Sequence, residues 1–152
     1  MINIIEVTEV SDKLIGALGQ LILQLSPSST LPSRTNLEEI VASSACHLFV
    51  AMDENLSGDI VGTLTLIVYR IPVGVKAWIE DLVVDENARG RGVATNLTRA
   101  ALKRAAELGA QEVNLTSAPS REAANRLYQH LDFVKSGTNV YQKTINDTST
   151  AS

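Results

Sequence analysis

Two arginines alternate with two glycines at residues 89–92, immediately before a segment with the apolar spacing of a helix. Glycine lets the backbone approach a ligand closely and adopt conformations that other residues avoid. The first turn of a helix leaves backbone N–H groups unpaired, and these groups attract anions together with the helix dipole. The turn therefore predicts a site for a phosphate or pyrophosphate. Its seven residues are Arg89, Gly90, Arg91, Gly92, Val93, Ala94 and Thr95.

Other phosphate-binding sequences do not fit this turn. The spacing Gly-x-Gly-x-x-Gly of dinucleotide-binding proteins fails because residue 95 is Thr95. A P-loop would need Gly-Lys followed by Ser or Thr, which is absent here. An arginine-glycine segment that binds RNA would be repeated and not flanked by ordered elements.

Composition narrows the class of protein. The 152 residues suit a single domain, and a hydrophobic fraction of 45% provides a core. A net charge of −4 and 4% aromatic residues argue against nucleic acid as a partner. The single cysteine, Cys46, excludes an internal disulfide and is typical of a reducing compartment. We see no signal peptide and no apolar run near the about 20 residues of a membrane span, so we expect a cytoplasmic protein away from membranes.

The elements that position the turn follow from periodicity and from turn residues. The strand before the turn covers residues 75–84, and the helix after it ends near Gly109. The remaining strands are expected at 2–7, 47–52, 60–69 and 113–116, with a closing hairpin at 133–136 and 139–144. The remaining helices are expected from Thr8 or Ser11 to 25, at 36–43 and at 119–131. The chain is therefore α/β, with a mostly antiparallel first half, a domain over 1–145 and a flexible C-terminal tail over 146–152.

With this order and two motifs, the chain resembles the GNAT superfamily of acetyl-CoA-dependent N-acetyltransferases. The family has Gln/Arg-x-x-Gly-x-Gly/Ala after its fourth strand, and here Arg89, Gly92 and Ala94 occupy the specified positions. A later family helix has the form Asn-x-x-Ala-x-x-Leu/Phe-Tyr-x-x-x-Gly-Phe. The matching positions here are Arg121, Ala124, Leu127, Tyr128, Asp132 and Phe133. Arg121 replaces the usual Asn and Asp132 replaces the usual Gly.

The resemblance implies a single-domain GNAT-like fold. Its mixed, mostly antiparallel sheet would have about seven strands and four helices, splayed between strands 4 and 5. Acetyl-CoA would be the cosubstrate, without a metal. By the resemblance, the backbone of Leu82, Val83 and Val84 faces the acetyl group and pantetheine arm. Leu115 and Thr116 would line the other side, and Arg121 would reach a phosphate of coenzyme A.

Two side chains would carry the proton transfers of this reaction. A phenol with an ordinary pKa near 10 can protonate a departing thiolate, so Tyr128 is the candidate general acid. Glu80 is the candidate base for the amine, directly or through water. Glu80 and Asp81 are adjacent on their strand, so strict alternation predicts that they point to opposite faces.

The acceptor is left open among small amines, amino sugars and protein amines. The resemblance places acceptor binding at the 26–34 loop, the 71–75 turn and the final hairpin. The sequence Ile-Glu-Asp at residues 79–81 resembles that of glucosamine-phosphate acetyltransferases. A homodimer is also left open. The alternative from another class is a non-catalytic acyl-CoA-binding sensor or interaction module with the same fold.

Overall fold

The computed structural model describes residues 1–145, so the tail predicted at 146–152 lies outside the described residues. It divides into two compact units, Met1–Thr116 and a second unit from Ser117 onward, and each is described by itself. The single domain predicted over 1–145 stays a prediction.

The first unit is a sheet with three helices. Along the chain it contains β1 (Ile2–Glu6), α1 (Asp12–Leu25), α2 (Arg34–Ala42), β2 (Cys46–Asp53), β3 (Asp59–Ile71), β4 (Gly74–Val84), α3 (Val93–Glu107) and β5 (Val113–Asn114). Two short 3-10 turns, Glu54–Leu56 and Glu86–Ala88, follow β2 and β4. The second unit contains α4 (Glu122–His130).

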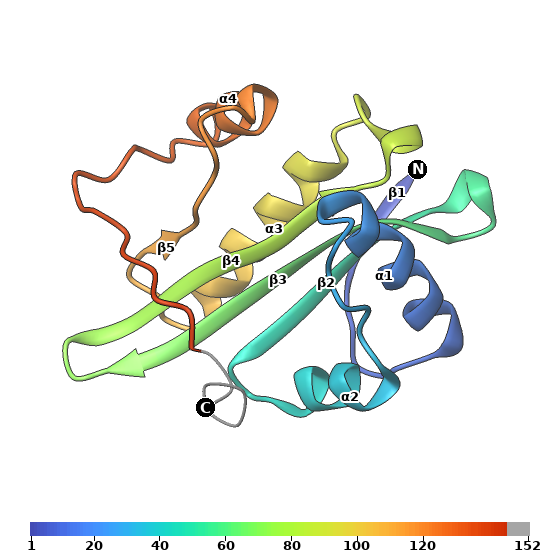
Figure 1. The fold of residues 1–152 in the computed structure, drawn as a ribbon, viewed down its shortest axis with the longest axis horizontal. Coiled ribbons are helices and arrows are strands. Elements are labelled where there is room, and N and C mark those ends of the chain that lie inside the picture. The colour runs from blue at the N-terminus through green and yellow to red at the C-terminus, as the bar shows by residue number, and fades with distance from the viewer. Residues whose placement is uncertain (146–152) are drawn as a thin grey trace, which may run out of the picture. The chain divides into compact units, whose positions relative to one another are not determined.

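The five strands form one sheet in the order β1-β2-β3-β4-β5. Pairs from β1 to β4 are antiparallel, whereas β5 runs parallel to β4. The parallel pairing is short, because it joins only Ala77 with Val113 and Trp78 with Asn114. Figure 1 shows β4 continuing well past β5. The predicted mixed sheet and four helices are confirmed.

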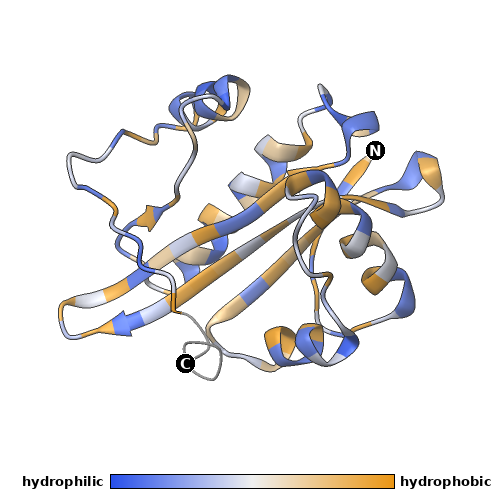
Figure 2. Ribbon diagram, viewed as in Figure 1, coloured by the Kyte–Doolittle hydropathy of each residue, from blue (hydrophilic) through white to orange (hydrophobic). Residues whose placement is uncertain are grey.

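The helices cover both faces of this sheet (Figure 1). Leu48 and Val50 of β2 pack with three leucines of α1 and α2, namely Leu14, Leu18 and Leu37. Val50 is paired with Thr63, so the neighbouring Gly62 points to the opposite face, which α3 covers. Figure 2 shows hydrophobic residues along β3 and β4, as expected for strands covered on both sides.

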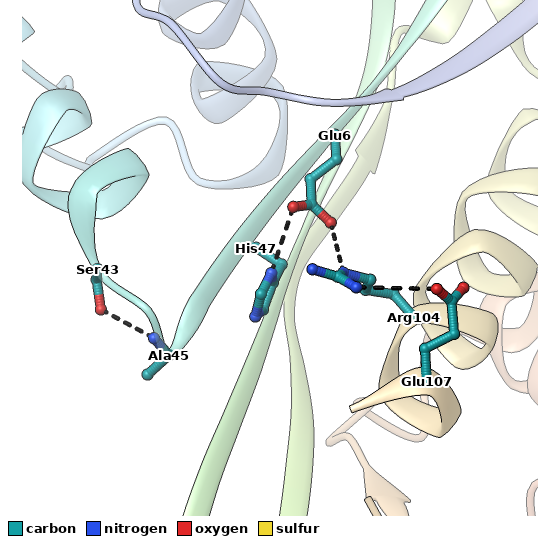
Figure 3. A network of polar contacts seen from close by, with 6 residues as sticks. All are labelled: Glu6, Ser43, Ala45, His47, Arg104 and Glu107. Atoms are coloured by element: carbon teal, nitrogen blue, oxygen red, sulfur yellow. Dashed lines mark hydrogen bonds and ion pairs between the residues drawn. The ribbon is translucent and has the colours of Figure 1, made fainter. Parts of the chain in front are cut away.

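Polar contacts hold the C-terminal end of α3 to the sheet (Figure 3). Arg104, in the last turn of α3, donates from Nε to Glu6 at 3.1 Å. The other oxygen of Glu6 lies 3.5 Å from Nδ1 of the buried His47 in β2. The helix ends at Glu107, close to the predicted end near Gly109, and Gly109 has the left-handed φ of 84° that is common just after a helix.

The prediction of a closing hairpin at 133–136 and 139–144 was wrong. Residues 133–145 contain no strand, so the sheet has five strands and not about seven. Four apolar side chains of this segment are more than two-thirds exposed: Val134, Val140, Tyr141 and Ile145. A strand is stabilised by packing against its neighbours, and the local pattern of residues does not supply that packing. The fifth strand is also shorter than predicted and ends at Asn114.

Candidate functional site

The N-terminus of α3 differs from those of α1 and α2 because no side chain caps it. Ser11 accepts a hydrogen bond from the Leu14 amide in α1, and Ser33 forms a reciprocal capping box with Asn36 in α2. The cap position of α3 is Gly92, which has no side chain to offer. The backbone N–H groups of the first turn of α3 are therefore available to an external acceptor.

Both glycines of the turn adopt the left-handed conformation, with φ of 79° at Gly90 and 76° at Gly92. No atom lies within 4 Å of the position that a Cβ would take at either residue. The glycines are thus required by backbone conformation, and the space beside them is open to a ligand. This observation fits a pyrophosphate against the turn.

Close packing seats this end of α3 on the sheet. A Cβ at Gly62 in β3 would lie 3.0 Å from Cγ1 of Val93 and 3.1 Å from Cδ1 of Leu97. Both side chains are buried in the first turns of α3. The missing side chain at Gly62 therefore brings the first turns of the helix close to the strands.

The two arginines of the turn have different surroundings. Arg89 is exposed and forms none of the ion pairs found among residues 1–145. Arg91 donates from Nη1 to Oδ2 of Asp53 at 2.7 Å, and its side chain stays 40% exposed. The hydrogen bond from Arg91 holds the pKa of the Asp53 carboxyl below its usual value, although burial acts in the opposite direction. One of the two arginines of the turn, Arg91, is therefore held by a carboxylate.

A β-bulge interrupts β4 immediately before the predicted pantetheine segment. Thr65 pairs with Glu80 and Thr63 with Val83, so Leu64 faces two residues of β4, Asp81 and Leu82. Asp81 has a φ of 51°. Strict alternation does not hold at this point: Glu80 and Asp81 are both exposed, and Leu82 and Val83 are both buried. A bulge of this kind changes the direction of backbone groups beside a site.

Apart from the two residues directly after β5, the predicted residues of the first unit lie on one continuous stretch of backbone from β4 to the start of α3. Val84 at the end of β4 leads through the 3-10 turn to Arg89 and to the start of α3. Thr116 follows β5, the short neighbour of β4. Arg121 and Tyr128 belong to the second unit, where Arg121 precedes α4 and Tyr128 lies within it.

Tyr128 is 7% exposed and packs edge-to-face with Phe133, with ring centroids 5.7 Å apart. Burial raises the pKa of its phenol, and the positive charge of Arg121 partly offsets this rise. Asp132 adopts the left-handed conformation that glycine usually supplies, with a φ of 67°. The Phe133 amide then donates to the Tyr128 carbonyl at 2.9 Å, so α4 still ends as a glycine-terminated helix would.

Within residues 1–145, no group of three or more His, Cys, Asp or Glu side chains is arranged to hold a metal ion. The same residues include no helix with the length and apolar character needed to cross a membrane.

Comparison with solved structures defines the class of fold. An aminoglycoside acetyltransferase from an uncultured soil metagenomic sample, solved in complex with sisomicin, matches with a TM-score of 0.82 and 21% identity. The match covers 95% of this chain and 97% of that one. The glucosamine-6-phosphate N-acetyltransferase of Arabidopsis thaliana matches with a TM-score of 0.78 and 20% identity, over 94% and 98% of the two chains. The fold is therefore that of an acetyltransferase.

The sequence identifies the family. Residues 20–133 match the acetyltransferase (GNAT) family. Glucosamine 6-phosphate N-acetyltransferase 1 of Oryza sativa subsp. japonica is 32% identical over 117 residues, which are 73% of this chain and 70% of that protein. The chain belongs to the GNAT family of acetyltransferases, and this family implies acetyl-CoA as the cosubstrate.

Two residues of this site were not found by sequence reasoning. Asp53 lies in the turn-like run Asp-Glu-Asn, where a carboxylate is ordinary turn chemistry. Gly62 lies inside a strand, where an isolated glycine signals a bulge or a close backbone approach. That second signal was present in the sequence, and the structure shows that the close approach is to α3.

Proposed function

We propose that this chain transfers the acetyl group of acetyl-CoA to a primary amine by direct attack of the amine in a ternary complex. The observation that carries the proposal is the uncapped start of α3, flanked by two left-handed glycines, in a member of the GNAT family. An uncapped helix start in open space is a site for an anionic group such as a pyrophosphate.

Coenzyme binding falls to the turn and to the strand before it. The amides of Val93, Ala94 and Thr95 donate hydrogen bonds to the pyrophosphate, and Arg89 supplies positive charge. The backbone of Leu82 to Val84 pairs with the pantetheine arm beside the end of β4. Thr116 borders the same arm, and Arg121 binds a phosphate.

Acetyl-CoA supplies a thioester, whose carbonyl carbon forms the new bond to nitrogen while its bond to sulfur breaks. The Leu82 amide donates to the carbonyl oxygen, where negative charge develops. Glu80 takes a proton from the amine, directly or through water. Tyr128 gives a proton to the departing sulfur. A phenol with the usual pKa of about 10 keeps its proton at neutral pH, and burial raises the pKa of Tyr128 further.

We further propose an amino sugar as the acceptor, with glucosamine 6-phosphate as the first compound to test. The support is the rice relative, whose name specifies that sugar phosphate. The aminoglycoside acetyltransferase solved with sisomicin supports a second, cationic class of amino sugar. Glucosamine 6-phosphate carries a negatively charged phosphate, whereas sisomicin is cationic, so an assay with both compounds distinguishes the two classes of acceptor.

The test is release of free thiol from acetyl-CoA in the presence of glucosamine 6-phosphate, glucosamine, sisomicin or a lysine peptide. We expect amine-dependent release, with the highest kcat/KM for glucosamine 6-phosphate. Comparison with unphosphorylated glucosamine measures the contribution of the phosphate. CoA should also raise the melting temperature, since a ligand at 100 times its Kd adds about 2.7 kcal/mol.

Two results would contradict the proposal in different ways. If millimolar CoA does not raise the melting temperature, coenzyme binding is excluded, and the proposed acetyl transfer is excluded with it. A clear shift without thiol release from any amine would favour the non-catalytic acyl-CoA-binding module. Release with a different amine would keep the activity and replace the acceptor.

A further inference from the structure

Asp53 is a buried carboxylate, and a buried charge needs partners that stabilise it. It lies at the end of β2 with 0% of its surface exposed, and it is the one acidic residue among the buried polar residues of the described chain. A buried charge is unfavourable unless it is paired and hydrogen-bonded. Its burial therefore requires a fixed partner.

The carboxylate is held from both sides. Oδ1 accepts the backbone N–H of Asn55 at 3.0 Å, which fixes the orientation of the group. Oδ2 accepts Nη1 of Arg91 at 2.7 Å. The backbone carbonyl of Asp53 also accepts the Gly58 amide at 3.0 Å. Asp53 is thus a rigid anchor, and Arg91 is the group that it restrains.

Arg91 stands between the two residues of the turn with the greatest conformational freedom. Gly90 and Gly92 both adopt left-handed conformations, and no atom packs against their Cα atoms from the side-chain direction. A turn built on such glycines loses much entropy when a ligand orders it. A restraint on the residue between them reduces that loss before binding and so favours affinity.

We propose that Asp53 is a positioning residue for coenzyme binding, which holds Arg91 and the turn 89–92 in the shape that receives the pyrophosphate of acetyl-CoA. The proposal rests on the proposed function. A guanidinium has five N–H donors, and the contact with Asp53 uses one. With 40% of its side chain exposed, Arg91 retains donors for a phosphate. The anchor therefore orients this arginine without using up its donors.

The other end of α3 provides a matched control. There Arg104 pairs with Glu6 (Figure 3). Because Arg91 pairs with Asp53 just before the start of α3, one arginine–carboxylate pair joins each end of this segment to the sheet. Asp53 and His47, which contacts Glu6, are six residues apart on β2, or about 20 Å along the strand. Loss of the Glu6 pair should loosen α3 without moving the turn.

The experiment measures the Kd for CoA by titration calorimetry, with melting temperatures, for the full chain, Asp53→Asn and Glu6→Gln. Asp53→Asn removes the charge and keeps the shape of the side chain. We expect it to weaken CoA binding by about tenfold or more, as for a lost hydrogen bond between charged groups. Glu6→Gln should lower the melting temperature and leave the Kd for CoA within about twofold, below the tenfold step of 1.4 kcal/mol.

Arg91→Lys is the second variant, because it keeps a cation beside Asp53 and removes the fixed fork. It should also weaken CoA binding. Asp53→Asn should weaken binding little further in the Arg91→Lys background, because the effects of substitutions at two residues in contact do not add. A folded Asp53→Asn protein that binds CoA as tightly as the unmodified chain would overturn the proposal. If Asp53→Asn does not fold, unchanged CoA affinity in Arg91→Lys would overturn it.

The two proposals fail differently. If the unmodified chain does not bind CoA, the proposed function fails and the role of Asp53 fails with it. If the unmodified chain binds CoA and both Asp53→Asn and Arg91→Lys do so equally well, the role of Asp53 alone is lost. A greater loss of affinity in Glu6→Gln than in Asp53→Asn would also overturn it, because the effect would then follow the seating of α3 and not the turn.

Discussion

Replacement of Gly62 by alanine tests how closely α3 must approach the sheet. The added Cβ would lie 3.0 Å from Val93 and 3.1 Å from Leu97, whereas ordinary contacts are 3.4–4 Å. Both neighbours are at most 2% exposed, so neither can turn toward solvent. The carbonyl oxygen of Val83, at 3.4 Å, limits movement on the strand side. The first turns of α3 must therefore shift by a few tenths of an ångström.

The magnitude follows from two opposing effects. Overpacking of a filled core costs about 1–3 kcal/mol. Gly62 is not among the described residues with positive φ, so alanine fits its backbone and reduces the entropy of the unfolded chain, a gain of about 0.4–1 kcal/mol. The net loss should be about 0–2.6 kcal/mol, with a middle value of about 1.3 kcal/mol, which lowers the melting temperature of a chain of this length by a few degrees. The Kd for CoA should rise as well, because the displaced turn carries the anion site.

The assay is thermal unfolding followed by circular dichroism, with CoA titration of the same samples. Gly16→Ala is the control, because Gly16 lies inside α1 with no atom near its Cβ position. That substitution should raise the melting temperature, since alanine favours a helix over glycine by about 1 kcal/mol. Val93→Ala should cost less in the Gly62→Ala background than alone, because it removes the atom at 3.0 Å. Equal or higher stability of Gly62→Ala with unchanged CoA affinity would refute this reasoning.

Three further predictions concern the turn and the two groups with shifted pKa values. Gly92→Val should raise the KM for acetyl-CoA and leave that for the amine unchanged, because φ is 76° at Gly92 and a side chain would occupy the anion site; equal changes in both KM values would contradict this. Tyr128→Phe should lower kcat by ~10²-fold with little change in CoA binding. Because the pKa of Tyr128 is raised, kcat of the unmodified chain should fall at high pH only above the usual phenol pKa of about 10. An unchanged kcat in Tyr128→Phe would exclude the phenol as the general acid. Because the folded pKa of Asp53 is lowered, its contribution to stability is complete above about pH 4 and is lost as pH falls through the folded pKa. Below pH 4 the melting temperature should therefore fall less steeply with pH in Asp53→Asn than in the unmodified chain. An equally steep fall would contradict the lowered pKa of Asp53.

Local sequence patterns predicted the elements around the turn well. The cap at Ser11, one of the two residues predicted for it beside Thr8, the helix end just before Gly109 and the start of α3 after Gly92 all depend on neighbouring residues along the chain. Each is decided by hydrogen bonds within one turn of helix, so local rules are sufficient. Of these three features, the start of α3 after Gly92 belongs to the predicted anion site.

Features that depend on distant partners were predicted poorly. The bulge at Asp81 breaks the alternation that placed Glu80 and Asp81 on opposite faces, and it arises from pairing with Leu64. The hairpin at 133–144 had a strand-like pattern, but no strand forms there. The bulge depends on pairing with Leu64 of the neighbouring strand, and the local period of two carries no information about that pairing. The apolar side chains of the hairpin segment stay exposed, so its strand-like pattern gains no stabilisation from packing.

Asp53 illustrates the same limit at the level of function. In the sequence it stands 38 residues before Arg91 and is one acidic residue in a polar turn. Only the fold shows that strand β2 ends beneath the turn after β4, so that a buried carboxylate meets an arginine between two glycines. In our proposal the motif residues bind the anion, whereas the readiness of the turn to bind it depends on Asp53, a residue outside the motif. Substitution of Asp53 therefore tests preorganisation more directly than substitution of Gly92, because it changes no residue of the turn.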